Sequence, residues 1–263
     1  YGMRGAELSV RFGDLEQSVV TDRDGYFRVH MKLDGRPPGE ALWHPMEIAL
    51  KRPAEPDARA KGEIFIPPPS ARTVVISDID DTVVHTGVAN KIAMLWRLFF
   101  VGAYSRVAFP GVAAFYRALH EGAGSPGAGP RGSEVNPMLY VSRGPWSIYE
   151  VMTEFFHLHR IPIGPVLFLR EWGLTLQRPL PPRAGDHKVV LIRHMMDIYD
   201  EMPVVLIGDS GQHDAELYAQ IVREYPGRVR AVYIRNVSRS DRRPAAIAAL
   251  AQEIEAAGST LIL

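Results

Sequence analysis

The feature that most constrains the fold is an apolar run that ends abruptly in acids. Residues 74–77 are Val-Val-Ile-Ser, and Asp78, Asp80, Asp81 and Thr82 follow within five positions. β-branched residues favour a buried strand, and a buried strand carries acids at its end only where they have partners or a role. In open α/β sheets, ligands bind at the carboxyl ends of strands. The run therefore predicts a central strand whose end contributes to a ligand site.

The part of the chain after residue 69 alternates strand-like and helix-like segments. Apolar runs predict strands at 73–77, 138–142, 166–169, 204–207 and 229–234. Amphipathic segments predict helices that begin near Val112, Pro145, Asp186, Asp214 and Pro244. This alternation predicts a Rossmann-like α/β fold, a parallel sheet with helices on both faces.

Residues 1–68 follow a different pattern. Apolar and polar residues alternate at 7–12, 27–31 and 46–50, as in half-buried strands. Prolines 67–69 form a stiff connector that suits neither a helix nor a central strand. We therefore predict an all-β, sandwich-like domain over 1–68 and an α/β domain over 69–263.

A turn cluster at residues 21–25 separates two of these alternating segments. Gly25 suits a positive φ, and Asp22 and Asp24 are potential calcium ligands. Because no complete loop of oxygen ligands follows, we predict a turn stabilised by Asx hydrogen bonds instead.

Composition excludes several classes of function. The formal net charge is zero, which argues against a general nucleic-acid binder. Cysteine is absent, which removes thiol catalysis, disulfides and cysteine-ligated metals, and fits a reducing compartment. The most apolar stretch, 92–103, contains Arg97 and is too short to span a bilayer. We expect a soluble, cytoplasmic protein whose oligomeric state the sequence leaves open.

Four polar signals recur in order at predicted strand ends and helix starts. They are Asp78-x-Asp80-x-Thr82, Ser142, Lys188 and a segment at 208–214 that contains Asp209 and Asp214. In this order and spacing, residues 71–240 resemble the haloacid dehalogenase-like superfamily. Longer strings at 78–87, 145–149, 169–173, 187–188 and 208–214 resemble the catalytic domain of the actin-patch-type phosphatidate phosphatase family. One departure is Arg143-Gly144, where that family has a small polar residue followed by serine.

The resemblance implies hydrolysis of a phosphomonoester, phosphatidate, to diacylglycerol and phosphate. It implies that Asp78 is the nucleophile, which forms an aspartyl-phosphate, and that Asp80 acts as general acid and then as base. An aspartate at position 80 favours phosphate-ester chemistry over carbon–halogen or carbon–phosphorus cleavage. Ser142 and Lys188 are expected to bind the phosphate oxygens, and Thr82 to fix the phosphate-binding loop through its hydroxyl.

A magnesium ion is the implied cofactor. A carboxylate that approaches a phosphate is repelled unless a cation intervenes, and Mg²⁺ prefers oxygen ligands. Asp78 and Asp209 are the expected carboxylate ligands, and Asp80 is expected to contribute its backbone carbonyl. Asp214 is expected to assist at the metal, directly or through water, or to orient Lys188.

Other interpretations of these residues stay open. Asp78 and Asp80 could form a solvated turn, Lys188 a solvated helix position and Ser142 a helix cap. Trp146, Tyr149 and Trp172 are expected to be packing residues. His85, His187 and His213 are neighbours of the motifs, and their roles are open, as is that of Asp81.

The segment 92–103 has two interpretations. An apolar helix that carries an arginine could dip into the surface of an anionic phospholipid membrane, or it could pack against the sheet. Two functional alternatives also stand: a phosphatase of a soluble metabolite or protein, and a membrane-recruited binding or scaffold protein on a phosphatase fold.

Overall fold

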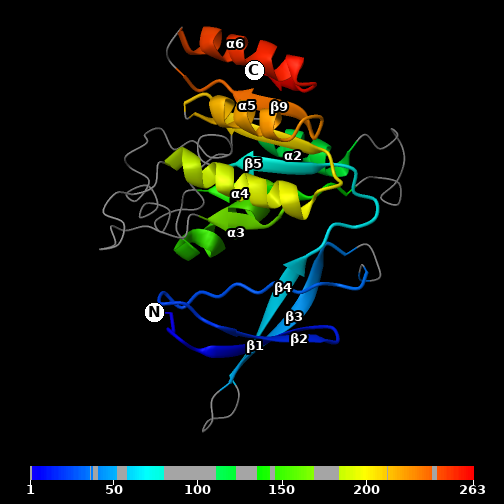
Figure 1. The fold of residues 1–263 in the computed structure, drawn as a ribbon, viewed down its shortest axis with the longest axis vertical. Helices are drawn as coiled ribbons and strands as arrows, with labels where there is room; N and C mark the ends of the chain where they lie inside the picture. The colour runs from blue at the N-terminus through cyan, green and yellow to red at the C-terminus, as the bar shows by residue number, and fades with distance from the viewer. Residues whose placement is uncertain are drawn as a thin grey trace. The chain divides into compact units, whose positions relative to one another are not determined.

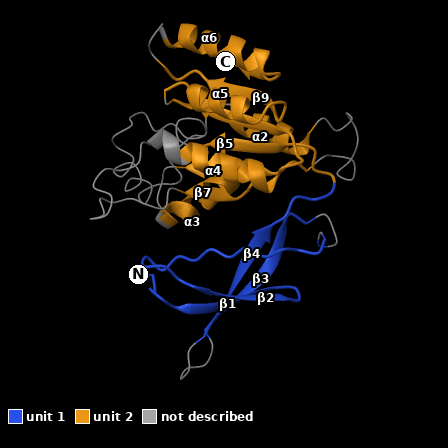
Figure 2. Ribbon diagram, viewed as in Figure 1, with its two compact units in different colours: residues 1–69 blue, residues 70–263 orange. Residues whose placement is uncertain are grey.

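The computed structural model describes residues 2–35, 37, 41–51, 58–79, 111–122, 135–142, 146–168, 184–211, 213–238 and 242–263. It leaves aside the side chains of residues 147, 184–187 and 242. The chain divides into two compact units, residues 1–69 and residues 70–263 (Figure 2). The predicted domains, 1–68 and 69–263, stay a prediction.

Unit 1 is built on a four-stranded antiparallel sheet with the order β2-β1-β3-β4. The strands are β1 (Glu7–Phe12), β2 (Leu15–Val20), β3 (Trp43–Leu50) and β4 (Arg59–Phe65). In the register of the sheet, Val10 lies opposite Gln17 on one side and Ile48 on the other. The all-β character predicted for this region is confirmed.

The segment that follows β2 confirms one prediction and corrects another. Asp22 Oδ1 accepts hydrogen bonds from the backbone N–H groups of Asp24 (3.0 Å) and Tyr26 (2.9 Å), which is the expected Asx turn. Gly25 has a φ of 86°, a left-handed conformation that glycine adopts without a steric penalty. The strand predicted at 27–31 is wrong, because these residues belong to no strand. Their side chains do alternate between part-buried and exposed, but alternation reports side-chain faces and not backbone pairing.

Unit 2 contains a six-stranded sheet with the order β10-β9-β8-β5-β6-β7, and all its pairs are parallel (Figure 1). The strands are β5 (Val74–Asp78), β6 (Met138–Ser142), β7 (Val166–Phe168), β8 (Val204–Asp209), β9 (Val229–Arg235) and β10 (Thr260–Ile262). The predicted parallel sheet is confirmed, and β10 is an edge strand that the sequence pattern did not predict.

Helices lie on both faces of this sheet (Figure 1). They are α2 (Val112–Glu121), the 3₁₀ turn η2 (Trp146–Ile148), α3 (Tyr149–His159), α4 (Ala184–Ile198), α5 (Asp214–Glu224) and α6 (Arg242–Ala256). Val75 and Ile79 pack in a buried cluster with α2 and α3, whereas the neighbouring Asp78 contacts Lys188 of α4. Side chains alternate along a strand, so Val75 faces α2 and α3, whereas Asp78 lies on the opposite face together with Val74 and Ile76.

Two helices begin at or close to the residues that the sequence predicts. Helix α4 begins at Ala184, so Asp186 lies within its first turn and does not precede it. Helix α5 begins at Asp214 itself, with His213 at the N-cap position. The Asp214 carboxylate thus belongs to a first helical turn, where the helix dipole favours negative charge.

Several predicted features lie outside the described residues. They are Asp80, Asp81, Thr82, His85, Trp172 and the segment 92–103. Among the residues that the structure describes, no helix has the length and apolar character needed to cross a membrane.

Candidate active site

Two neighbouring strands at the centre of the sheet end in aspartates. Asp78 is the last residue of β5 and Asp209 the last residue of β8. The two strands pair in parallel, with Ser77 opposite Ile207, so both carboxylates emerge at the same edge. Both residues are almost fully buried, because the strands that carry them lie in the middle of the sheet.

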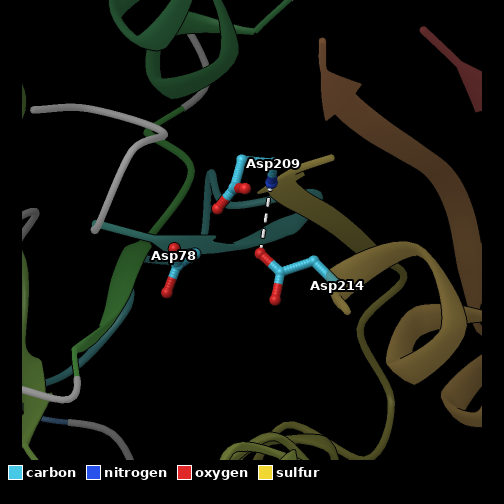
Figure 3. Close-up of side chains that lie close together, drawn as sticks. All are labelled: Asp78, Asp209 and Asp214. Atoms are coloured by element: carbon cyan, nitrogen blue, oxygen red, sulfur yellow. Dashed lines mark hydrogen bonds between the residues drawn. The ribbon is translucent and has the colours of Figure 1, made fainter. Parts of the chain in front are cut away.

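A third aspartate joins them from the start of α5. Asp214 Oδ2 accepts a hydrogen bond of 3.1 Å from the backbone N–H of Asp209 (Figure 3). This approach depends on Gly208, because a Cβ atom there would lie 2.4 Å from Asp214 Oδ2 and 2.8 Å from Tyr218 Cε2. Glycine at position 208 therefore allows α5 to begin directly against β8.

One lysine lies among these acids. Lys188 Nζ lies 2.9 Å from Asp78 Oδ1 and 2.5 Å from Asp214 Oδ1, and its side chain is only 4% exposed. Burial alone would lower the pKa of Lys188, but Asp214 and Asp78 together raise that pKa above its ordinary value. The ammonium therefore stays protonated at neutral pH. Of the roles expected for Asp214, contact with Lys188 is the one that the described side chains form directly.

The cluster has an excess of negative charge that suits a metal ion. Ligand oxygens of Asp78, Asp209 and Asp214 all lie within 4.8 Å of one another. Three buried carboxylates against one ammonium leave two negative charges in excess when all are ionised, and like charges at this range repel strongly. Oxygens that share one Mg²⁺ lie within about 4.2 Å of one another, and that ion commonly takes one or two carboxylates and fills the rest with water. An all-oxygen set close to this spacing therefore fits a hard divalent cation.

The remaining predicted residues fall into two groups. Ser142 ends β6 and is buried, and the residue before it, Val141, pairs with Asp78 across the sheet. The structure thus brings Ser142 to the same edge as the aspartates. Asp80 and Thr82 lie outside the described residues, so their roles stay predictions, as do the catalytic roles of the others.

The strand that carries Asp78 is also fixed on its other face. Ser77 Oγ donates to the carbonyl oxygen of Asp78 at 2.8 Å, so the Tyr116 hydroxyl, 2.6 Å away, donates to Ser77. Burial raises the pKa of Tyr116 well above its ordinary value, which keeps this donor protonated. The hydrogen bonds hold the end of β5 between α2 and the aspartate cluster.

A second set of contacts holds the loop after Asp209, and the sequence pattern did not reveal it. Ser210 Oγ accepts from the backbone N–H groups of Val237 (2.9 Å) and Ser238 (3.1 Å). Arg243 Nε donates to the Ser210 carbonyl at 2.9 Å, and its guanidinium pairs with Glu216. The partners are far apart in sequence and match no local motif, which is why the pattern gave no signal.

The described aromatic and histidine side chains near the motifs are accessible to solvent. Trp146 and Tyr149 are 41% and 39% exposed, and both rings pack on Phe168. They are packing residues, as expected, but on a surface and not in the core. The His213 side chain is 87% exposed, and its Nδ1 lies 3.9 Å from Glu216 Oε2.

Comparison with known proteins matches the chain to one family and to two curated proteins. Residues 73–236 match the family described as phosphatidate phosphatase APP1, catalytic domain. The chain is 28% identical over 166 residues to phosphatidate phosphatase APP1 of Saccharomyces cerevisiae, which covers 63% of this chain and 26% of that protein. It is 26% identical over 164 residues to an uncharacterized protein of Schizosaccharomyces pombe, covering 62% of this chain and 25% of that protein.

The chain thus matches about a quarter of the length of each of these curated relatives. Among solved structures, that of DsGPDH of Dunaliella salina aligns with 62% of this chain and 31% of its own, at 17% identity and a TM-score of 0.36.

Proposed function

The chain belongs to the family of phosphatidate phosphatase APP1 catalytic domains, and from that premise we propose that it hydrolyses phosphatidate to diacylglycerol and phosphate. The observation that carries this proposal is the buried cluster of Asp78, Asp209, Asp214 and Lys188 within the matched segment. Burial of several charges lowers stability, so a cluster of this kind is expected where chemistry requires it.

Asp78 is the proposed nucleophile. One of its carboxylate oxygens attacks the phosphorus atom, a new O–P bond forms, and the bond from phosphorus to the ester oxygen breaks. Asp80 is proposed to donate a proton to that ester oxygen, which leaves as the alcohol group of diacylglycerol. Mg²⁺, held by Asp78 and Asp209 with Asp214 near by, would supply positive charge against the phosphate when bound.

The second half of the reaction restores the carboxylate. A water molecule attacks the aspartyl-phosphate while Asp80 removes its proton, and inorganic phosphate leaves as Asp78 is released. Lys188, which stays protonated at neutral pH, is proposed to stabilise charge on the phosphate oxygens, and Ser142 to donate a hydrogen bond to them. Asp214 holds the Lys188 ammonium in place through its 2.5 Å contact.

The proposed partner is an anionic phospholipid surface. Peripheral contact through residues 92–103 and a cytoplasmic location are parts of this proposal. The membrane contact follows from the lipid nature of the proposed substrate and from the apolar, arginine-bearing sequence of that segment, and the cytoplasmic location from the absence of cysteine.

The test is a substrate panel with purified protein. Phosphatidate in mixed micelles is compared with glycerol 3-phosphate, a nucleoside monophosphate and a phosphopeptide, each with Mg²⁺ and with EDTA, and with Asp78→Asn as the blank. We expect release of phosphate from phosphatidate that requires Mg²⁺ and is absent in the blank. Turnover of soluble esters alone would show that the substrate is a soluble phosphomonoester and not phosphatidate. The absence of turnover with any phosphomonoester would overturn the proposed activity.

A further inference from the structure

A mainly apolar cavity of about 280 Å³ lies in unit 2. It is bounded by the start of α2 and by β8, β9 and β10. The described residues that line it include Val112, Phe115, Ile207, Tyr233, Arg235 and Ile262. Its volume is near the lower end of the range of ligand pockets in proteins.

The cavity is close to the candidate active site along the sheet. Ile207 lies two residues before Asp209 on β8, which is a distance of about 7 Å along a strand. Arg235, at the end of β9, lies directly opposite Asp209 in the register of the sheet. Tyr116, which also lines the cavity, donates to Ser77 beside Asp78. Ile207 and Arg235 therefore form the end of the cavity nearest Asp209, and the other end reaches β10.

Charge is distributed unevenly over the lining. Arg235 is the one charged side chain among the described residues of the wall, and it lies at the end nearest Asp209. The wall toward β10 is formed by Phe115, Tyr233 and Ile262, and Ile262 is 42% exposed. A cation at the Asp209 end of the wall and apolar side chains toward β10 complement an amphiphile with an anionic head and a hydrocarbon tail.

We propose that the cavity binds the hydrocarbon chain of a phosphate monoester whose phosphate group lies at Asp78. This inference rests on the proposed function and names the part of the protein that selects a lipid substrate. The apolar wall gains free energy with each methylene group removed from water, so chain length is the property that it distinguishes. A small polar ester leaves the cavity unused.

The first experiment measures turnover of alkyl phosphates from methyl to dodecyl, below their critical micelle concentrations and with Mg²⁺. For the 263-residue chain we expect kcat/KM to rise about tenfold or more from methyl to dodecyl phosphate and then to level off. In Val112→Trp and Ile262→Trp, which narrow the cavity, this gain is expected to be lost.

The matched control is Ile198→Trp, since Ile198 is also an exposed isoleucine of unit 2 and does not line the cavity. It is expected to retain the full gain with chain length. Two narrowing variants are used because Ile262 is partly exposed, so its substitution leaves the protein folded even if Val112→Trp does not.

The second experiment separates this inference from the proposed activity. Binding of dodecylphosphonate and methylphosphonate, which are not hydrolysed, is measured by calorimetry in the same proteins. Tighter binding of dodecylphosphonate than of methylphosphonate, with the difference lost in the narrowing variants, supports binding of the hydrocarbon chain in the cavity even if no ester is turned over. A chain-length preference that is absent from the unchanged protein, or that survives in both narrowing variants, overturns the proposal.

Discussion

The two units differ in how they bury apolar side chains and charges. Among the described residues, the buried apolar side chains of unit 1 are Val10, Pro67 and Pro68, whereas the strands and helices of unit 2 enclose an extensive core. The ion pair between Arg11 and Glu47 joins neighbouring strands of unit 1 with side chains that are 52% and 48% exposed. The pair between Lys188 and Asp78 in unit 2 is 4% and 0% exposed.

This difference shows that the effect of an ion pair on stability depends on whether the pair is exposed to water or buried. Water screens the exposed pair, so it adds little to stability and can be changed freely. The core of unit 2 excludes water, so its charges interact strongly, and loss of the Lys188 ammonium leaves the buried acids uncompensated. Substitutions in this buried cluster should therefore have large effects, and substitutions in the exposed ion pair of unit 1 small effects.

The largest effect is expected for Asp78→Asn. The amide cannot form the proposed aspartyl-phosphate, so kcat should fall by about 1,000-fold or more. Because the change removes one of three neighbouring negative charges, the melting temperature should not fall. The assay is phosphate release beside a thermal melt, and a variant that turns over at the unchanged rate would contradict the proposed mechanism.

A large loss of stability is expected for Lys188→Met. The methionine fills a similar volume but leaves Asp78 and Asp214 without their ammonium, which should lower the free energy of unfolding by about 3 kcal/mol. Urea unfolding measures this change. Added Mg²⁺ should restore part of the loss by supplying positive charge, and an unchanged urea midpoint would show that the lysine is not compensating the acids.

A moderate effect is expected for Arg243→Gln, with Arg223→Gln as the matched control. Both arginines join α5 to α6, Arg243 through Glu216 and Arg223 through Glu253, but only Arg243 also holds the Ser210 carbonyl. Arg243→Gln should lower the free energy of unfolding by about 1 kcal/mol, since solvent partly screens the pair, and should weaken the response to Mg²⁺. Arg223→Gln should change neither.

The ion pair between Arg243 and Glu216 predicts that the stability of the protein depends on pH. The hydrogen bond from Arg243 lowers the pKa of Glu216, so the pair contributes stability above the ordinary glutamate pKa of about 4.3 and loses it as the pH falls further. Arg243→Gln should therefore lose less stability on acidification than the unchanged protein. Equal acid sensitivity of the two proteins would contradict this account.

The smallest effect is expected for Glu47→Gln in unit 1. Its hydrogen bond to Arg11 lowers the pKa of Glu47, but both side chains are exposed. The thermal melt of unit 1 should not change within error, and phosphate release should be the same. A clear drop in melting temperature would contradict the claim that the exposed ion pair of unit 1 adds little to stability.

Much of this arrangement could be predicted from the sequence because it is local. Asp78, Ser142 and Asp209 each end an apolar run, and the ends of parallel strands meet at one edge of a sheet. The contact of Lys188 with Asp214 was only one of several expected roles, because it depends on how α4 and α5 lie beside each other. The support of Ser210 by Arg243 joins residues with no shared pattern. The failed strand at 27–31 had the correct alternation but no pairing partner among the described strands.

The space available at Gly208 controls the distances between the charged side chains of the aspartate cluster. The distance from Asp214 to Asp209 and to Lys188 is fixed by how closely α5 can approach β8, and that approach uses the space that a methyl group would fill. Electrostatic energy varies with distance, so a change of volume at an uncharged position would alter the affinity for a cation and the environment of the lysine together. The interaction energy among these charged side chains therefore depends partly on Gly208, a residue that has no side chain.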